Sequence, residues 1–196
     1  MLKVNFAKLL IKPIFKILKK CVSETGEKTY VVGGYVRDYI IKKSDRKDID
    51  IVVVGSGIKL AKNIKPKLPN SSKIKIFKSY GTAMINWGDL TLEFVGARKE
   101  SYTKESRNPK VYSSSLEEDQ KRRDFTINTL AISLNKEDFG SLIDPFNGII
   151  DLENKIIRTP LDPSKTFSDD PLRMLRAIRF SCQLNFNIEL KSLKAI

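Results

Sequence analysis

The sequence predicts an α/β fold, in which a small mixed sheet carries flanking helices and is followed by helices alone. Two β-branched runs, residues 30–32 and 49–54, have the composition of short buried strands. Between them the pair Gly33-Gly34 allows a sharp turn, and residues 35–41 have apolar side chains at helical spacing. The rest of the chain is organised around this strand, turn, helix and second strand.

The amino-terminal segment is rich in lysine. Residues 4–22 place apolar side chains at helical spacing with lysines between them, and Pro13 is expected to kink or split the helix. Organelle-targeting peptides favour arginine and serine, and neither occurs before Ser23. We therefore expect an amphipathic helix packed on the domain rather than a targeting peptide.

Further elements of the sheet follow the second strand. A helix is expected at residues 58–65, before Pro66, and a hairpin turn at residues 86–89. Strands are expected at residues 73–77, 82–87 and 91–95. The segment 98–120 is polar and lacks a periodic apolar face, so we predict a mobile loop there.

The carboxyl-terminal part reads as the end of one domain and the start of another. Residues 143–158 predict a turn, a short helix and a short strand that close a first, catalytic domain spanning residues 1–160. A second, helical domain is expected at residues 161–196. Within it, residues 167–180 predict one helix, with Ser168 as its cap and Pro171 in its first turn.

Composition narrows the possible functions. The 196 residues carry a formal net charge of +13, which favours a polyanionic partner, nucleic acid first and an anionic membrane second. The chain has no histidine, and its two cysteines lie far apart, which excludes histidine general-base catalysis and zinc catalysis. No apolar run approaches the roughly 20 residues that span a bilayer. We expect a cytoplasmic protein with no membrane partner.

Two carboxylates at the start of the second strand indicate the chemistry. Asp48 and Asp50 flank Ile49, so the period of two places both on one face of the strand. Adjacent carboxylates repel unless a cation lies between them, and Mg²⁺ is the usual occupant. The backbone N–H groups of Gly33 and Gly34 can bind phosphate. This combination suggests phosphoryl or nucleotidyl transfer, with two metal ions roughly 3.5–4 Å apart.

Two stretches further along the chain carry charged side chains at helical spacing. In residues 121–131 we expect a helix start, where Arg122 and Arg123 neutralise triphosphate charge, Asp124 lies in the first turn and Asn128 bonds a sugar hydroxyl or phosphate. In the second domain the spacing of three and four residues places Asp169, Asp170 and Arg173 on one helical face, which a salt-bridged surface helix would share. Arg176 and Arg179 continue that basic face. Glu93, between Leu92 and Phe94, projects from the face opposite to these two apolar residues, as a solvent-exposed side chain would.

Together these motifs resemble those of the class II nucleotidyltransferases, the family of CCA-adding enzymes and bacterial poly(A) polymerases. The resemblance rests on Gly-Gly-x-Val-Arg-Asp at residues 33–38, Asp-x-Asp at 48–50, Arg-Arg-Asp-Phe-Thr-x-Asn at 122–128 and Asp-Asp-x-x-Arg at 169–173. The chain departs from the family pattern at Thr129, where Ala is usual, and at Asp169, where Glu is commoner. The resemblance covers roughly residues 29–186.

The resemblance implies a polymerase-β-like head followed by a helical neck, acting on the 3′ end of tRNA with CTP, ATP and Mg²⁺. It implies Asp48 and Asp50 as metal ligands and Glu93 as a third carboxylate of the catalytic site. The residues implied in nucleotide binding are Gly33, Gly34, Arg37, Asp38, Arg122, Arg123, Asp124, Asn128, Asp169, Asp170, Arg173, Arg176 and Arg179. Three alternatives stay open: a poly(A) polymerase, an enzyme that adds only CC or only A, and a non-catalytic RNA-binding domain.

Overall fold

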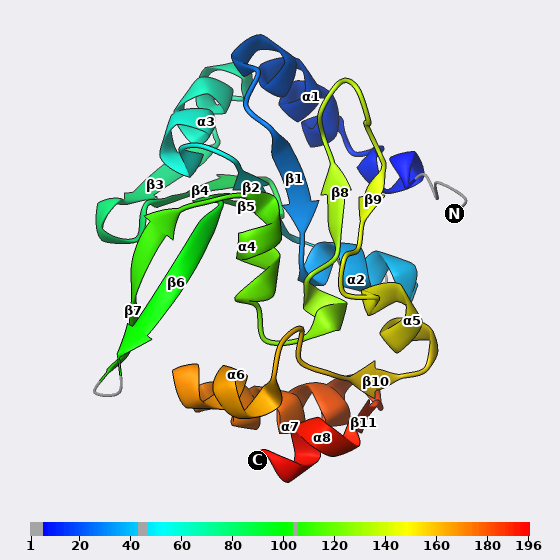
Figure 1. Ribbon diagram of the computed structural model, residues 1–196. Helices are drawn as coiled ribbons and strands as arrows, with labels where there is room; N and C mark the ends of the chain where they lie inside the picture. Colours follow the sequence, from blue (N-terminus) through cyan, green and yellow to red (C-terminus); the bar gives the residue numbers. More distant parts are fainter. Residues whose placement is uncertain (1–5, 43–46, 104–105) are drawn as a thin grey trace. The chain divides into compact units, whose positions relative to one another are not determined.

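The computed structural model describes residues 6–42, 47–103 and 106–196, which form two compact units. The first unit contains the chain up to Ala97 together with Ala131–Ile143, and the second contains Arg98–Leu130 together with Asp144–Ile196 (Figure 1). This division follows packing and differs from the predicted boundary near residue 160, which remains a prediction. No helix in the described ranges is long and apolar enough to span a membrane.

The amino-terminal segment forms two short helices, η1 (Ala7–Leu10) and α1 (Pro13–Thr25). Pro13 occupies the first turn of α1, where its missing N–H costs no hydrogen bond. Gly26 ends the helix with φ 67°, and its N–H donates to the carbonyl of Val22 at 3.0 Å. The predicted split at Pro13 and the amphipathic helix after it are confirmed; residues 4 and 5 of the prediction lie outside the described residues.

A seven-stranded mixed sheet forms the body of the first unit, in the order β3-β4-β5-β2-β1-β8-β9. Only the central pair, β2 and β5, is parallel. The strands are β1 (Thr29–Val32), β2 (Asp48–Val53), β3 (Lys73–Phe77), β4 (Thr82–Trp87), β5 (Leu90–Gly96), β8 (Ala131–Ser133) and β9 (Leu142–Ile143). The helices of this unit are α2 (Gly34–Ile40), α3 (Gly57–Ile64), η2 (Lys65–Lys67) and η3 (Lys78–Tyr80).

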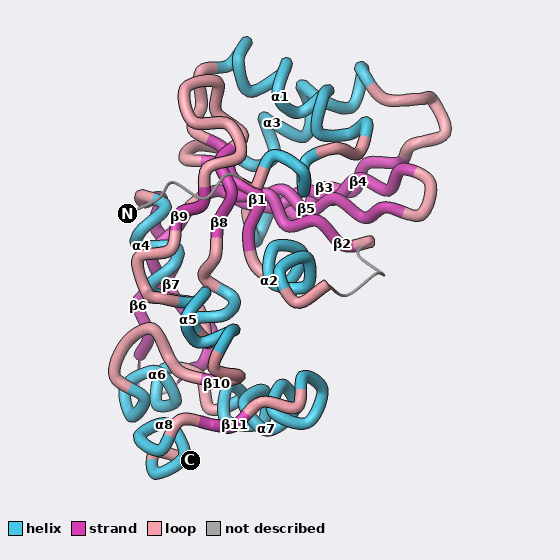
Figure 2. The backbone as a smooth tube through the Cα atoms, turned by 90° about the vertical axis from the view of Figure 1, so that its right-hand side faces the viewer, coloured by secondary structure: helices cyan, strands magenta, loops and turns pink. Residues whose placement is uncertain are grey.

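The central strands have one apolar face and one polar face. Ile49 and Ile51 on β2, and Leu92 and Phe94 on β5, are fully buried. Helix α3 packs on β4 and β5, and Figure 2 shows α1 and α3 on the same side of the sheet. Gly57 begins α3 where a Cβ atom would lie 2.6 Å from the carbonyl oxygen of Phe94, so the helix approaches the strand closely. The alternate residues of β2 and β5 are left on the opposite face for chemistry.

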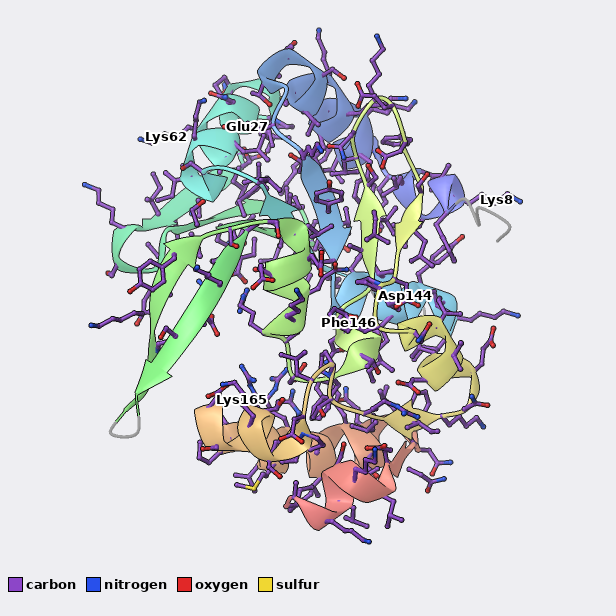
Figure 3. All side chains as sticks on the ribbon, viewed as in Figure 1. Lys8, Glu27, Lys62, Asp144, Phe146 and Lys165 are labelled. Carbon is purple, nitrogen blue, oxygen red and sulfur yellow. The ribbon has the colours of Figure 1, made fainter. Side chains whose placement is uncertain are left out.

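The second unit is mostly helical. It begins with an antiparallel ribbon, β6 (Arg98–Thr103) and β7 (Ser106–Ser113), and contains a short parallel pair, β10 (Ile156–Ile157) and β11 (Asn187–Ile188). Its helices are α4 (Leu116–Lys121), η4 (Thr126–Asn128), α5 (Gly148–Glu153), α6 (Pro163–Asp169), α7 (Leu172–Leu184) and α8 (Leu190–Lys194). Asp144, labelled in Figure 3, accepts hydrogen bonds from the N–H groups of Gly148 at 2.7 Å and Ile149 at 3.0 Å, which anchors the start of α5.

Three predictions in this unit are wrong. Residues 98–103 and 106–113 pair as the β6–β7 ribbon, and 116–120 lie in α4, rather than forming a mobile loop, because backbone pairing in a two-stranded ribbon needs no apolar face. Residues 104 and 105 of that prediction lie outside the described residues. A helix does start within residues 121–131, the short 3-10 helix η4 at Thr126, but the prediction that Asp124 lies in its first turn is wrong, because Asp124 lies between α4 and η4. Residues 167–180 form two helices, because Pro171 disfavours helical geometry at Asp170, which is extended at φ −146° and ψ 100°. Ser168 therefore lies inside α6 and caps nothing.

Candidate active site

The two predicted metal ligands lie on the polar face of β2. Asp48 is exposed and Asp50 is partly buried, while Ile49 between them is fully buried. In the parallel pairing of β2 with β5, the Cα of Asp50 lies opposite that of Glu93. Residues paired in this way project from the same face of a sheet. The structure therefore brings the three predicted carboxylates onto one face of two neighbouring strands.

The glycine turn lies next to these carboxylates. β1 runs antiparallel to β2 with Val32 opposite Asp50, so the residues after Val32 lie beside the beginning of β2. Gly33 has φ 69° and ψ −135°, a conformation that side-chain-bearing residues rarely adopt, and α2 begins directly after it. The turn thus presents backbone close to the aspartates, as the sequence predicted.

Arg37 belongs to this turn. Its side chain is buried, and its Nε donates to Asp38 Oδ1 at 2.8 Å. A Cβ atom on Gly34 would lie 3.6 Å from Nη2 of Arg37, so the guanidinium folds back over the turn. One positive charge is therefore held within the segment predicted to bind phosphate.

The donor atoms on this face fit a hard cation. Asp48, Asp50 and Glu93 offer only carboxylate oxygens, which Mg²⁺ prefers. In the described ranges, no three Cys, Asp or Glu side chains are grouped so that they could hold one metal ion. Mg²⁺ is commonly bound by one or two carboxylates, with water and substrate phosphates completing its shell, so the Asp48 and Asp50 pair suits it. Glu93 lies on the same face of the sheet, but in the described residues it does not form a three-carboxylate metal site with Asp48 and Asp50.

A cluster of charged side chains in the second unit contains Arg122 and Arg123. Both guanidinium groups bond the carboxylate of Asp119, which is 0% exposed: Arg122 Nη2 donates to Oδ1 at 2.7 Å, and Arg123 Nη2 donates to Oδ2 at 3.0 Å. Arg122 Nη1 also donates to Glu100 Oε1 at 2.9 Å. Burial opposes the charge on Asp119, but Arg123 and Arg122 outweigh it and hold the pKa of the carboxyl below its ordinary value of 3.8.

Asp124 connects the segment before η4 with helix α7. Its Oδ1 accepts from Asn128 Nδ2 at 3.0 Å and from the N–H of Phe125 at 2.9 Å, while Oδ2 accepts from Arg176 Nε at 2.7 Å. Asp124 and Asn128 are both buried. Three of the predicted nucleotide-binding residues are thus in direct contact.

Arg173 is held by main-chain oxygens. Its Nη2 donates to the carbonyl of Arg122 at 2.8 Å and its Nη1 to that of Thr166 at 3.4 Å, and its side chain is buried. These bonds tie α7 to the segment that follows α4 and to α6. The base-recognition candidate therefore lies beside the phosphate-binding candidates within the second unit.

The other predicted residues of α6 and α7 are arranged differently. Asp169 lies at the end of α6 and pairs with Lys165, labelled in Figure 3, at 2.9 Å. The prediction that Asp169 shares one helical face with Arg173 is wrong, because the break at Asp170 separates the two helices. Asp170 Oδ1 accepts from the N–H of Leu172 at 3.1 Å, and the guanidinium of Arg179 lies 4.9 Å from the Phe180 ring centroid.

Sequence reasoning missed Asp119. The signal was available, because an aspartate followed by arginines three and four residues later places all three on one side of a helical turn. Because residues 98–120 were predicted to be a loop, the helical spacing of Asp119 with the two arginines was not considered.

Comparisons with known proteins identify the family of the chain. A family model described as the poly A polymerase head domain matches residues 29–158. The A-adding tRNA nucleotidyltransferase of Aquifex aeolicus (strain VF5) is 47% identical over 161 residues, which cover 82% of this chain and 19% of that protein. The CCA-adding enzyme of Bacillus velezensis (strain DSM 23117 / BGSC 10A6 / LMG 26770 / FZB42) is 37% identical over 194 residues, covering 98% of this chain and 45% of that protein.

Solved structures give the same result. A CCA-adding enzyme in apo form II superposes with a TM-score of 0.87 at 37% identity, over 100% of this chain and 47% of that one. A tRNA nucleotidyltransferase complexed with a primer tRNA and an incoming ATP analog superposes with a TM-score of 0.77 at 40% identity, over 91% of this chain and 48% of that one. The chain spans less than half the length of each of these four proteins. With its predicted α/β fold confirmed, the chain belongs to the poly A polymerase head domain family.

Proposed function

We propose that this chain catalyses template-independent nucleotidyl transfer to the 3′ end of tRNA, adding CCA from CTP and ATP. One observation carries the proposal: Asp48 and Asp50 share a face of β2 beside the Gly33 turn, with Glu93 opposite Asp50 on β5. The net charge of +13 suits an RNA partner, and the relatives described above are named for tRNA nucleotidyl transfer. Two free cysteines, one buried and one exposed, fit the cytoplasm.

Asp48 and Asp50 are the residues that would hold the metal. Nucleotidyltransferases of this family depend on a metal ion, and the oxygen-only donor set favours Mg²⁺. Bound Mg²⁺ would supply Lewis-acid stabilisation of charge on the attacking hydroxyl and on the triphosphate. Glu93, on the same face, would add negative charge that favours cation binding.

The glycine turn and the arginines would bind the nucleotide. Backbone N–H groups of Gly33 and Gly34, with the guanidinium of Arg37, suit phosphate oxygens, and Asp38 fixes the Arg37 side chain through its 2.8 Å bond. In the second unit, Arg122 and Arg123 suit phosphate oxygens as well.

The sugar and the base would be recognised by residues of the second unit. Asp124 and Asn128, which are bonded to each other, suit a ribose hydroxyl. Arg173 and Asp170 suit the Watson–Crick edges of C and A, whose exocyclic amines both donate hydrogen bonds. Asp169 remains a candidate through its place beside Asp170, while Arg176 and Arg179 would contribute positive charge from α7.

A second candidate is addition of A alone. The relatives from Aquifex aeolicus at 47% identity and Geobacter sulfurreducens (strain ATCC 51573 / DSM 12127 / PCA) at 41% identity are both A-adding enzymes. The motifs of the active site are compatible with either specificity, so the substrate assay has to separate them.

Single-nucleotide addition tests the proposal. The chain is incubated with Mg²⁺ and each of the four NTPs separately, on tRNA lacking CCA and on tRNA ending in CC. We expect CTP addition to the first substrate and one ATP addition to the second. ATP addition confined to the second substrate supports A-only addition, and repeated ATP addition supports a poly(A) polymerase.

The matched variants are Asp50→Asn, which we expect to be inactive, and Asp89→Asn in the exposed β4–β5 turn, which we expect to be active. Activity in Asp50→Asn would refute the metal-site assignment, and RNA binding without addition by the unchanged chain would favour a non-catalytic domain.

A further inference from the structure

Asp119 makes an unusual set of contacts for a buried carboxylate. Arg122 contacts Oδ1 through Nε at 3.0 Å and Nη2 at 2.7 Å, and Arg123 contacts Oδ2 through Nε at 3.2 Å and Nη2 at 3.0 Å. The N–H of Arg98 also donates to Oδ1, at 3.4 Å. Each oxygen of the Asp119 carboxylate therefore accepts hydrogen bonds from both Nε and Nη2 of one arginine.

The orientation of the two guanidinium groups follows from these contacts. A guanidinium has five N–H donors, and the Nε–Nη2 edge of each arginine is occupied by Asp119. Nη1 of Arg122 donates to Glu100 Oε1 at 2.9 Å, and Nη1 of Arg123 donates to the carbonyl of Asn128 at 3.3 Å. In each group three of the five donors meet an acceptor in the described part of the chain. The Nη1–Nη2 end of each arginine keeps further donors for an anion.

The charges of the cluster do not cancel. Arg98, Arg122 and Arg123 are positive, whereas Asp119 and Glu100 are negative, and Glu100 Oε1 also accepts from Arg98 Nη2 at 3.1 Å. The cluster therefore keeps one net positive charge. The side chains of Arg122 and Arg123 are 19% and 16% exposed, so solvent reaches them while Asp119 stays buried.

We propose that Asp119 is a positioning residue, which fixes the adjacent guanidinium groups of Arg122 and Arg123 so that their outer N–H groups bind the phosphates of the incoming nucleotide. This inference rests on the nucleotidyl transfer proposed above. Asp119 itself does not touch the substrate. Asp119 holds each arginine side chain in one rotamer before the nucleotide binds. Binding then loses less side-chain conformational entropy than it would with mobile arginines.

The test compares affinities for nucleotides that differ in phosphate number. Dissociation constants of the full chain for ATP and AMP are measured by calorimetry in the presence of Mg²⁺. We expect Asp119→Asn to weaken ATP binding about tenfold, because hydrogen bonds to charged groups are lost, and to leave AMP binding within about twofold. Glu117→Gln is the matched control, because Glu117 lies on the same helix with a side chain that is 64% exposed and pairs with Lys121.

A second variant keeps the test decisive if Asp119→Asn does not fold. Glu100→Gln removes a charged partner that Arg122 shares with Arg98 and leaves Arg123 with its bonds to Asp119, and we expect a loss of ATP affinity of about threefold with AMP again unchanged. Asp119→Glu keeps the charge and is expected to recover part of the ATP affinity in a folded protein.

Several outcomes would overturn the inference. Tighter ATP binding in the folded variants would mean that Asp119 competes with phosphate for the arginines, and unchanged binding would mean that it does not position them. Equal losses for ATP and AMP would mean that the carboxylate supports the fold alone. If the unchanged chain binds no ATP, the proposed function fails and this inference fails with it, whereas ATP binding that is insensitive to Asp119 refutes the inference only.

Discussion

Arg176 on α7 and Asp124 before η4 are joined through Arg176 Nε and Asp124 Oδ2 at 2.7 Å, although they lie 52 positions apart in the chain. The Asp124 side chain is 8% exposed and that of Arg176 is 37% exposed. The guanidinium of Arg176 also lies 5.2 Å from the centroid of the Phe180 ring. This one side chain therefore joins α7 to the residues proposed to bind ribose.

Removing that bond should destabilise the second unit. In Arg176→Met the buried carboxylate of Asp124 keeps its hydrogen bonds from Phe125 and Asn128 but loses its charged partner. Such a loss typically costs about 1–3 kcal/mol. The free energy of unfolding, measured by urea denaturation, should fall by this amount. Arg179→Met is the control, because Arg179 stacks on the same ring without an ion pair to Asp124, and we expect a smaller change. Equal effects in the two variants would contradict a specific role for the ion pair.

The Asp119 cluster should weaken in acid. The pKa of Asp119 is below its ordinary value of 3.8, so its ionised form stabilises the folded state above that pH, and the contribution is lost as the pH falls through the lower folded value. At neutral pH, Asp119→Asn should cost about 3 kcal/mol, since it removes the buried carboxylate that two partly buried arginines share. The difference in unfolding free energy between the two proteins should shrink steadily below about pH 4. A difference that is constant between pH 7 and pH 2.5 would argue against this account.

Alanine should destabilise the fold at Gly148 and be tolerated at Gly34. At Gly148 a Cβ atom would lie 2.4 Å from the carbonyl oxygen of Thr126, so Gly148→Ala must displace η4 or α5 and should cost about 1–3 kcal/mol. At Gly34 the nearest atom is Arg37 Nη2 at 3.6 Å, an ordinary contact, so Gly34→Ala should keep its melting temperature within about 2 °C. Thermal unfolding followed by circular dichroism checks both. A melting temperature of Gly148→Ala equal to that of the unchanged chain would rule out the close packing of α5 on η4.

RNA binding should depend strongly on salt. Because each neutralised phosphate releases a counterion, a protein that contacts several phosphates binds RNA much more weakly at about 200 mM than at about 50 mM salt. We expect the dissociation constant for tRNA to rise at least tenfold over this range, as measured by filter binding. A flat response would argue that the net charge of +13 is spread over the surface rather than gathered at an RNA site.

Local signals in the sequence predicted the first unit well. Pro13 predicted the split between η1 and α1, the period of two placed Asp48 and Asp50 on one face, and the glycine pair predicted the turn into α2. Each of these features depends on neighbours within a few residues, which is the range over which propensity and periodicity act. The roles of these residues in catalysis remain predictions.

The second unit was harder to predict, because its order comes from distant contacts. The β6–β7 ribbon has no apolar periodicity, and Tyr112 and Val111 on it are half exposed. The sequence placed Asp170 and Arg173 in one helix, but Pro171 set the preceding residue in an extended conformation. The bond from Arg173 to the carbonyl of Arg122 joins segments 51 positions apart, and no local pattern encodes it.

The discontinuity of the first unit has a consequence for biosynthesis. Strand β1 pairs on one side with β2, which follows it closely, but on the other side with β8, where Tyr30 lies opposite Ser133. A ribosome that builds the chain from its amino end therefore exposes one edge of β1 until about 100 more residues have been made. During that interval the unpaired edge of a strand whose four residues are all buried in the folded protein is open to pairing with other nascent chains. Strand β1, which directly precedes the Gly33 turn, therefore stays open to wrong pairing until β8 has been synthesised.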